Sequence, residues 1–258
     1  MNIGIIGVGY VGLVTGSCLA DFGHKVFCLD NDQKRINDLK KGILPIYEPG
    51  LEDVVSRNAS TGRLHFETNL KKILHELKVV FVAVGTPSRR EDGNADLANI
   101  YEVFEGLREI LKPQQTVVIK STVPVGTNKK ISAILNAGRS KIFDVVSNPE
   151  FLREGSAIED FMKPDRVIVG LKSEKTKKVM AEVYKPLYLR EFPIIYTDPE
   201  SAEITKYASN AFLATKISFI NELANLSEKI GVNIEDISIG MGLDKRIGSR
   251  FLRAGPAY

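Results

Sequence analysis

The stretch IGIIGVGYVG, residues 3–12, decides the fold of this chain because it joins a strand-like apolar run to a glycine turn. Its second half matches the pattern G-x-G-x-x-G and reads Gly7-Val8-Gly9-Tyr10-Val11-Gly12. In such a turn the first glycine permits a tight bend, the second lets the backbone approach a pyrophosphate, and the third lets the next helix pack closely on the strand. The pattern therefore predicts a helix from Leu13 to Phe22 whose N-terminus favours an anion.

An acidic residue follows this turn at the end of the next expected strand, Lys25–Leu29. Asp30 lies 23 residues after Gly7, where a carboxylate can accept hydrogen bonds from a ribose hydroxyl and repels a 2′-phosphate. Asp32 adds to that repulsion, whereas the positive charge of Arg35 keeps NADP open as an alternative. The turn and the acid together favour NAD over NADP, and a glycine-rich turn without a ligand is the remaining alternative.

Short apolar runs rich in Val and Ile recur along the chain, with helical patterns between most of them. These runs do not alternate cleanly between apolar and polar residues, which is typical of strands buried on both faces of a parallel sheet. The expected strands are Ile3–Ile6, Lys25–Leu29, Val79–Val84, Thr116–Lys120, Phe143–Ser147, Arg166–Gly170 and Ile194–Tyr196. They predict an α/β fold in which a Rossmann-like, doubly wound, mostly parallel sheet is followed by a long helix that opens an α-helical central domain.

The long helix begins the second part of the chain. Asp198 and Pro199 are typical of an N-cap and a first helical residue, and the helical pattern runs from Glu200 to Ile230 and stops at Gly231. We therefore expect an NAD-binding domain over residues 1–197 and the start of a helical central domain over residues 198–258. A second helix is expected from about Asn233, followed by a loop over residues 240–258.

Apolar residues occupy more than one side of this long helix, so it calls for more than one packing partner. They are Ile204, Tyr207, Phe212, Ile217, Ile220, Leu223 and Leu226. One partner is expected to be the sheet domain, and the other a second subunit or a further domain. A single long core helix is the alternative.

The overall composition excludes several function classes. The chain is 43% apolar and 26% charged, with a net charge of +3 and no basic run, so we expect no nucleic-acid partner. No apolar stretch approaches the roughly 20 residues that span a bilayer, and we expect a cytoplasmic protein without a membrane segment or leader. Cys18 and Cys28 are too few for a disulfide scaffold and are expected to pack in the core. No metal site is predicted.

Three loops at the expected carboxyl ends of strands carry residue types that suit a ligand, since ligands bind at that edge of open α/β sheets. The loops cover residues 84–87, 121–126 and 148–155. The hydroxyls of Thr86 and Thr122 could bond to a nicotinamide ribose or a reactive water. Glu150 and Glu154 would share one face of a helical turn and could act as a base or bind sugar hydroxyls. Ordinary turn chemistry and a solvated acidic face are the alternatives.

The first turns of the long helix carry a further group of polar residues. Lys206 and Asn210 form an i, i+4 pair on one face. A lysine beside a reacting hydroxyl can stabilise an alkoxide, or act as a base if it is desolvated. Equally, Glu203 and Lys206 could form a plain surface ion pair.

Taken together, these motifs resemble the UDP-glucose 6-dehydrogenase family of nucleotide-sugar dehydrogenases. The resemblance covers residues 1–258, with the motifs in the order of the family. The matching stretches are GVGYVGLVTGSCLA, VGTPS, STVPVG, NPEFLREGSAIEDF, PDRVIVG, AEITKYASNAFLATKISFINELA and RIGSRFLRAG.

The resemblance implies the oxidation of the C6 hydroxyl of a UDP-hexose to a carboxylate, with two NAD molecules and cysteine-bound intermediates. It implies that the NAD contacts are Gly7, Gly9, Val11, Gly12, Asp30, Arg35, Thr86, Thr122 and Glu154. The catalytic residues that it implies are Glu150, which serves water activation, and Thr122, Lys206 and Asn210. The implied substrate contacts are Glu150, Phe151, Leu152, Arg153, Glu154, Lys206, Asn210, Phe251, Leu252, Arg253, Ala254 and Gly255.

The resemblance also implies a nucleophile that this sequence does not contain. In the family the 251–255 loop runs into Gly-Gly-Ser-Cys-Phe-Pro-Lys-Asp, whereas this chain stops at Tyr258. We therefore expect a truncated chain that lacks the C-terminal UDP-binding domain and is inactive alone, because neither Cys18 nor Cys28 can substitute. In the complete protein, the implied partners are UDP-glucose or a similar UDP-sugar and a second copy bound through the long helix.

Three alternatives remain open at this point. A related dehydrogenase acting on UDP-ManNAc or GDP-mannose would share most motifs, although the 251–255 tail favours UDP-glucose. A β-hydroxyacid dehydrogenase would also place Lys and Asn on a helix after a Rossmann domain, but the 148–155 loop argues against it. A non-catalytic NAD-binding module is the third.

Overall fold

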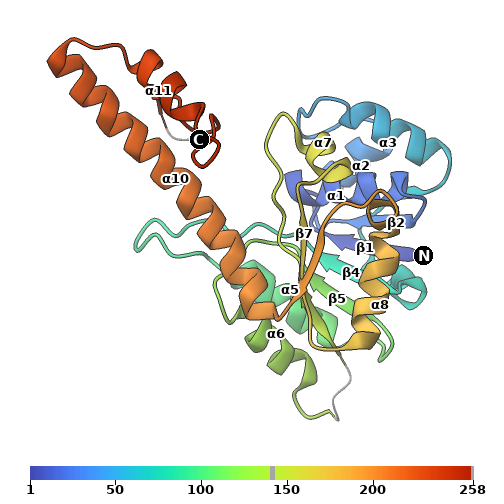
Figure 1. Cartoon of the computed structure of the whole chain (residues 1–258). Helices are drawn as coiled ribbons and strands as arrows, with labels where there is room; N and C mark the ends of the chain where they lie inside the picture. Colours follow the sequence, from blue (N-terminus) through green and yellow to red (C-terminus); the bar gives the residue numbers. More distant parts are fainter. Residues whose placement is uncertain (140–142, 257–258) are drawn as a thin grey trace. The chain divides into compact units, whose positions relative to one another are not determined.

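The computed structural model describes residues 1–139 and 143–256, and the chain divides into two compact units, residues 1–204 and 205–258 (Figure 1). The end of the chain at Tyr258, on which the expectation of a truncated chain rests, lies outside the described residues. The first unit contains a sheet with its covering helices, and the second consists of helices and turns.

The first unit is built on one eight-stranded sheet, in the order β3-β2-β1-β4-β5-β6-β7-β8. All pairs from β3 to β6 are parallel, β7 is antiparallel to β6, and β8 is parallel to β7. The strands are β1 (Asn2–Ile6), β2 (Lys25–Leu29), β3 (Leu64–Glu67), β4 (Val79–Val82), β5 (Thr116–Ile119), β6 (Val145–Ser147), β7 (Val167–Gly170) and β8 (Ile194–Thr197). The predicted mostly parallel sheet is confirmed.

The sequence analysis missed β3. This strand has four residues, its side chains alternate between buried and half-buried, and it lies at an edge of the sheet. The run Leu-His-Phe-Glu is therefore neither long nor continuously apolar, and it does not show the pattern of a strand buried on both faces.

Helices cover both faces of the sheet, so the predicted doubly wound architecture is confirmed. They are α1 (Tyr10–Asp21), α2 (Gln33–Lys40), α3 (Leu51–Ser60), α4 (Leu70–Ile73), the 3-10 turn η1 (Leu74–Glu76), α5 (Ala98–Arg108), α6 (Thr127–Asn136), α7 (Ala157–Met162), α8 (Glu174–Val183) and α9 (Lys185–Tyr188). One hydrophobic cluster joins Leu13 of α1 and Val183 of α8 to the sheet. The other joins Phe104 of α5 and Leu135 of α6 to the opposite face.

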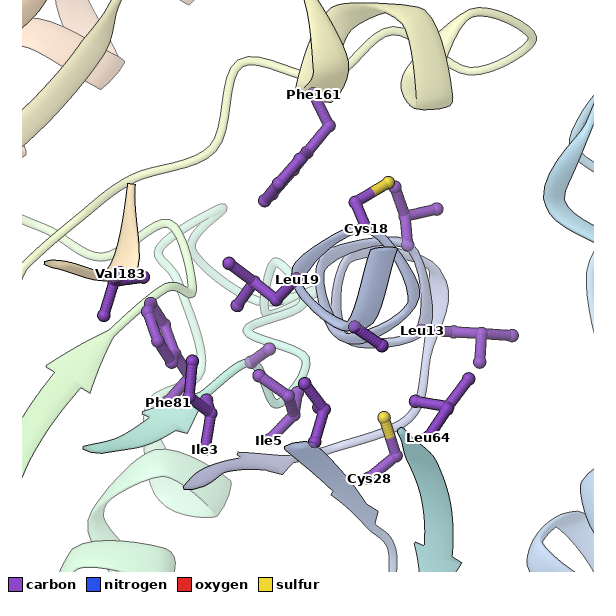
Figure 2. Close-up of a cluster of buried hydrophobic side chains, with 14 of the residues drawn as sticks. Ile3, Ile5, Leu13, Cys18, Leu19, Cys28, Leu64, Phe81, Phe161 and Val183 are labelled. Atoms are coloured by element: carbon purple, nitrogen blue, oxygen red, sulfur yellow. The ribbon is translucent and has the colours of Figure 1, made fainter. Parts of the chain in front are cut away.

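The two cysteines belong to the first cluster and are both buried and free. Figure 2 shows Cys18 on the side of α1 towards Phe161 and Cys28 on the sheet beneath the helix. Burial raises the pKa of both thiols, that of Cys28 to about 12. Both side chains are therefore neutral packing groups at neutral pH, and the prediction that they pack in the core is confirmed.

The helix α10 (Pro199–Ile230) begins and ends at the predicted signals, and the helix α11 (Ile234–Gly242) begins at its predicted cap. The Asp198 carboxylate accepts from the N–H of Ser201 at 2.7 Å, and the Asn233 side chain caps α11 by accepting from the N–H of Glu235. Gly231 follows α10 with a φ of 74°, in the left-handed region that suits glycine.

The expected loop from Gly240 was wrong in its first residues, because α11 continues to Gly242. A Cβ on Gly242 would lie 3.0 Å from the Cα of Ser249. This glycine therefore serves a close approach between the helix and the following turn.

The α1 and α3 helices are joined by the carboxylate of Asp21. It accepts from the Nε and Nη2 atoms of Arg57 at 2.8 and 2.9 Å and from the amide of Asn58 at 3.0 Å. The bidentate bond from Arg57 lowers the pKa of Asp21. Because the folded-state pKa is depressed, this bond stabilises the protein above the unfolded pKa and its effect is lost as the pH falls.

Replacing Asp21 with Asn should lower the free energy of unfolding at pH 7 by about 1 kcal/mol, since Arg57 is half-exposed and water screens part of the attraction. The difference from the parent protein should shrink as the pH falls through about 4 towards the lowered folded-state pKa of Asp21, because the carboxyl group is protonated first in the unfolded state and only then in the folded state. Urea unfolding at pH 7 and pH 3 checks this. Glu105→Gln, on the exposed face of α5, serves as the control. A loss equal at both pH values would contradict the assignment.

Candidate functional site

The glycine turn adopts the geometry that its three glycines require. Gly7 has a φ of 92°, and a Cβ there would lie 2.8 Å from the carbonyl oxygen of Ala83. A Cβ on Gly12 would collide with the carbonyl oxygen of Gly7, whereas a Cβ on Gly9 would meet nothing within 4 Å. The first and third glycines are therefore needed for the fold, and the second leaves open space beside the turn.

The helix α1 begins at Tyr10, three residues earlier than expected. Its cap residue is Gly9, which has no side chain to accept a bond, and its first turn contains no acidic residue. The positive end of the helix dipole is thus not compensated by a carboxylate of its own first turn, and the N–H groups of Tyr10 and Val11 lie at that end. This arrangement fits a phosphate group.

Asp30 lies beside the turn at the carboxyl end of β2. Its Oδ2 atom accepts from the N–H of Val8 at 2.8 Å and from the Nη1 atom of Arg35 at 3.1 Å. Its Oδ1 atom accepts from the N–H of Asp32 at 3.0 Å. Arg35 is therefore engaged with a carboxylate of its own chain, which weakens the argument that it serves a 2′-phosphate.

The loops after β4 and β5 are bonded to each other. The hydroxyl of Thr86 donates to the carbonyl oxygen of Thr122 at 2.8 Å, and the hydroxyl of Ser121 donates to that of Val84 at 2.6 Å. The two threonines from the sequence analysis are thus neighbours at the carboxyl edge of the sheet.

The loop after β6 differs from the prediction, because Glu150 and Glu154 do not lie on a helix. Residues 148–153 have no regular secondary structure, and α7 begins at Ala157. The Glu150 carboxylate accepts from the N–H of Leu152 at 2.5 Å. Such a local bond gives the backbone an alternative to a helical turn, so the two carboxylates need not share a face.

The other members of this loop have partners of their own. The guanidinium group of Arg153 binds the carboxylate of Asp160, and the ring of Phe151 lies 3.8 Å from the guanidinium carbon of Arg166. Leu152 is half-buried against the first hydrophobic cluster. The Glu154 side chain is exposed.

Sequence reasoning missed Glu48, which is 4% exposed. Its Oε1 atom accepts from the N–H of Ala157 at 2.8 Å, and its Oε2 atom accepts from the N–H of Gly155 at 2.8 Å and from the hydroxyl of Tyr10 at 2.6 Å. This carboxylate ties the loop after β6 to the first turn of α1. The Glu-Pro-Gly triplet before α3 is typical of a turn, so nothing local indicated these partners.

Glu203 has a similar role on the neighbouring loop. It is 3% exposed, and its two oxygens accept from the N–H groups of Gly126 and Asn128, each at 2.7 Å. It thereby caps α6, and burial raises its pKa. A plain surface ion pair was the alternative left open for this residue, and its burial contradicts that alternative.

The remaining predicted residues belong to the second unit. Lys206 and Asn210 lie one turn apart on α10. The side-chain amide of Asn221 binds both the N–H and the carbonyl oxygen of Gly255, at 2.8 and 2.9 Å, and the hydroxyl of Ser238 donates to the carbonyl oxygen of Leu252. These bonds hold the 251–255 segment to α10 and α11. A hollow there is lined by Ile217, Phe251, Arg253, Ala254, Gly255 and Pro256.

Within the described residues, none of the helices has both the length and the apolar character needed to cross a bilayer. Over the same residues, no group of three or more His, Cys, Asp or Glu side chains is arranged to hold a metal ion.

Comparison with known proteins identifies close relatives. Residues 1–188 match the NAD binding domain of the UDP-glucose/GDP-mannose dehydrogenase family, and residues 200–258 match its central domain. The UDP-glucose 6-dehydrogenase of Rhizobium meliloti (strain 1021) is 52% identical over 261 residues, which cover 100% of this chain and 60% of that protein. The chain therefore spans about three fifths of the length of this relative.

Solved structures show the same relationship. A UDP-glucose dehydrogenase from Pyrobaculum islandicum superposes with a TM-score of 0.92 at 39% identity, covering 98% of this chain and 59% of that one. A ternary complex of GDP-mannose dehydrogenase from Pseudomonas aeruginosa gives a TM-score of 0.88 at 35% identity, covering 100% of this chain and 61% of that one.

The glycine turn gives a paired prediction. Gly12→Ala should lower the free energy of unfolding by about 2–3 kcal/mol, because its methyl group forces apart the backbone of the turn and α1. Gly9 has a φ of −79° and open space around it, so Gly9→Ala should change the free energy of unfolding by no more than about 0.5 kcal/mol. Urea unfolding of both variants measures the contrast, and equal losses would contradict the described turn.

Proposed function

The chain belongs to the UDP-glucose/GDP-mannose dehydrogenase family, and from this premise we propose that it provides the NAD site and part of the sugar site for the oxidation of UDP-glucose to UDP-glucuronate. The complete reaction removes two hydrides from C6 in two steps. UDP-glucose is the proposed substrate, rather than GDP-mannose or UDP-ManNAc, because curated relatives that are 52% and 50% identical to the chain are UDP-glucose 6-dehydrogenases. Membership of this family argues against the β-hydroxyacid dehydrogenase alternative.

The observation that carries the proposal is the uncapped N-terminus of α1 beside the buried Asp30 carboxylate. In this proposal the open space at Gly9 and the N–H groups of Tyr10 and Val11 hold the pyrophosphate of NAD. Asp30 binds an adenosine ribose hydroxyl and Arg35 supports that carboxylate. When bound, NAD supplies the hydride acceptor of the reaction.

The further NAD contacts lie at the same edge of the sheet. Thr86 and Thr122, joined by a hydrogen bond, come from the loops after β4 and β5, and Glu154 comes from the loop after β6. We assign these three residues to the nicotinamide half of the cofactor, because a ligand that extends along the carboxyl edge from Asp30 passes these loops in strand order.

The chemistry at C6 requires that the hydroxyl lose its proton as the hydride leaves. We assign Lys206 and Asn210 to the hydroxyl oxygen, where an ammonium group stabilises the developing alkoxide. Thr122 contributes a hydroxyl beside the reacting atoms. Glu150 activates the water that hydrolyses the cysteine-bound intermediate at the end of the reaction. Residues 150–154 and 251–255 form the contacts to the UDP-sugar.

The second oxidation needs a nucleophile that neither cysteine of this sequence supplies. Cys18 and Cys28 are buried, and burial keeps both thiols protonated at neutral pH. We therefore propose that the 258-residue chain binds NAD but does not complete the four-electron reaction. An NAD-binding module without its own activity shares this behaviour.

Two further assignments complete the proposal. In the complete protein, α10 contributes to a homodimer contact, which is supported by the exposed side chains of Phe212, Phe219 and Leu226. The expected compartment is the cytoplasm.

Replacing Asp30 with Asn should weaken NAD binding by about 10-fold or more, because a bond to a charged group is lost and the new amide N–H₂ opposes the N–H of Val8. NADP binding should not weaken in parallel, since the repulsion of its 2′-phosphate is removed. Calorimetric titration with both nucleotides measures this. Asp53→Asn on the exposed face of α3 is the control, and an equal loss for both nucleotides would contradict the assignment to the ribose.

Mixing the 258-residue chain with NAD and UDP-glucose should produce no sustained rise of NADH absorbance, although a calorimetric titration shows NAD bound. The loss of a covalent nucleophile lowers the rate by several orders of magnitude. Continuous turnover would refute this part of the proposal and would assign the chemistry to Lys206 and Asn210 without a cysteine.

A further inference from the structure

We propose that Tyr10 and Glu48 are positioning residues that couple NAD binding at the glycine turn to the shape of the loop carrying Glu150 and Glu154. This inference rests on the proposed NAD site. The group formed by Tyr10, Glu48, Gly155 and Ala157 is called the Glu48 clamp below. It joins three segments of the first unit that are far apart in sequence.

The carboxylate of Glu48 has three protein donors. Two are the backbone N–H groups of Gly155 and Ala157, 107 and 109 residues further along the chain, and the third is the hydroxyl of Tyr10. A carboxylate that is 4% exposed is stable in the interior only when such bonds replace its water. The clamp therefore fixes the backbone of residues 155–157, directly after Glu154.

Tyr10 connects this carboxylate to the turn. It is the first residue of α1, so its N–H belongs to the uncapped end of the helix where the pyrophosphate is proposed to bind. Its hydroxyl donates to Glu48 at 2.6 Å and lies 3.3 Å from the carbonyl oxygen of Arg153. One residue thus lies at the phosphate end of the site and holds the loop assigned to the nicotinamide end.

The hydroxyl remains a donor across the working pH range. Burial, followed by the bond to Glu48, raises the pKa of Tyr10. The Tyr10 hydroxyl therefore keeps the proton that it donates to Glu48. By linkage, any ordering of the turn by NAD orders residues 153–157, and any loosening of those residues weakens NAD binding by the same factor.

Tyr10→Phe tests the coupling with the smallest change, because it removes one hydroxyl and leaves the two backbone bonds of Glu48. We expect the dissociation constant of NAD to rise about 5–10-fold. Hydrogen exchange at the amides of residues 153–157 should be faster in the variant, and NAD should protect them less than in the parent protein. Tyr47→Phe, a neighbouring ring that is 90% exposed, should change neither quantity.

Glu48→Gln and the double variant separate coupling from independent effects. Gln keeps the shape of the Glu48 side chain but places an N–H₂ group against one of the donors that the carboxylate binds. NAD affinity should therefore fall at least as far as in Tyr10→Phe. If Tyr10 acts through Glu48, the double variant should lose no more affinity than Glu48→Gln alone. Additive losses would overturn the inference. Should Glu48→Gln fail to fold, the measurements on Tyr10→Phe decide alone.

The outcomes distinguish this inference from the proposed function. If the parent chain does not bind NAD, the proposed function fails and this inference fails with it. If the parent binds NAD and Tyr10→Phe binds it equally well, the NAD site stands and the coupling is refuted. Faster exchange at residues 153–157 with unchanged NAD affinity would make the Glu48 clamp a purely structural feature and would also refute the coupling.

Discussion

The close approach of α1 to the glycine turn is the constraint on which the rest of the first unit depends. The carbonyl oxygen of Gly7 occupies the space that a side chain at position 12 would need, so the helix can begin at Tyr10 only because Gly12 has no Cβ. This contact places the N-terminus of α1, the positive end of its dipole, at the carboxyl edge of the sheet. It also places the Tyr10 ring where it reaches Glu48.

Buried carboxylates hold the loops at the carboxyl edge of the sheet. Asp30 accepts from the turn after β1, Glu203 from the loop after β5, and Glu48 from the loop after β6. Each side chain comes from a different part of the chain than the loop it holds. A carboxylate that accepts backbone N–H bonds compensates its own desolvation and at the same time restrains a loop, so bonds made within the protein hold the loops of this edge.

The proposed site residues are divided between the two units. The residues assigned to NAD all lie in the first unit, at the carboxyl ends of β1, β2, β4, β5 and β6. Residues assigned to the sugar come from both units, since 150–154 belong to the first and 206, 210 and 251–255 to the second. The proposed cofactor contacts therefore belong to a single compact body.

The sequence alone determined the features that depend on neighbours within a few residues: the glycine turn, Asp30 after β2, the caps Asp198 and Asn233, and the end of α10 at Gly231. It failed where distant partners decide. The edge strand β3, for example, is recognisable only beside β2. The loop after β6 was mispredicted for a different, local reason, since the Glu150 carboxylate accepts from the N–H of Leu152 two residues further along. Glu48 and Glu203 look like ordinary surface acids in sequence. Only the tertiary structure shows that both are buried. The N–H donors to Glu203 lie 75 or more residues away in the sequence, and the N–H donors of the loop after β6 lie more than 100 residues from Glu48. No local sequence pattern encodes contacts between residues so far apart.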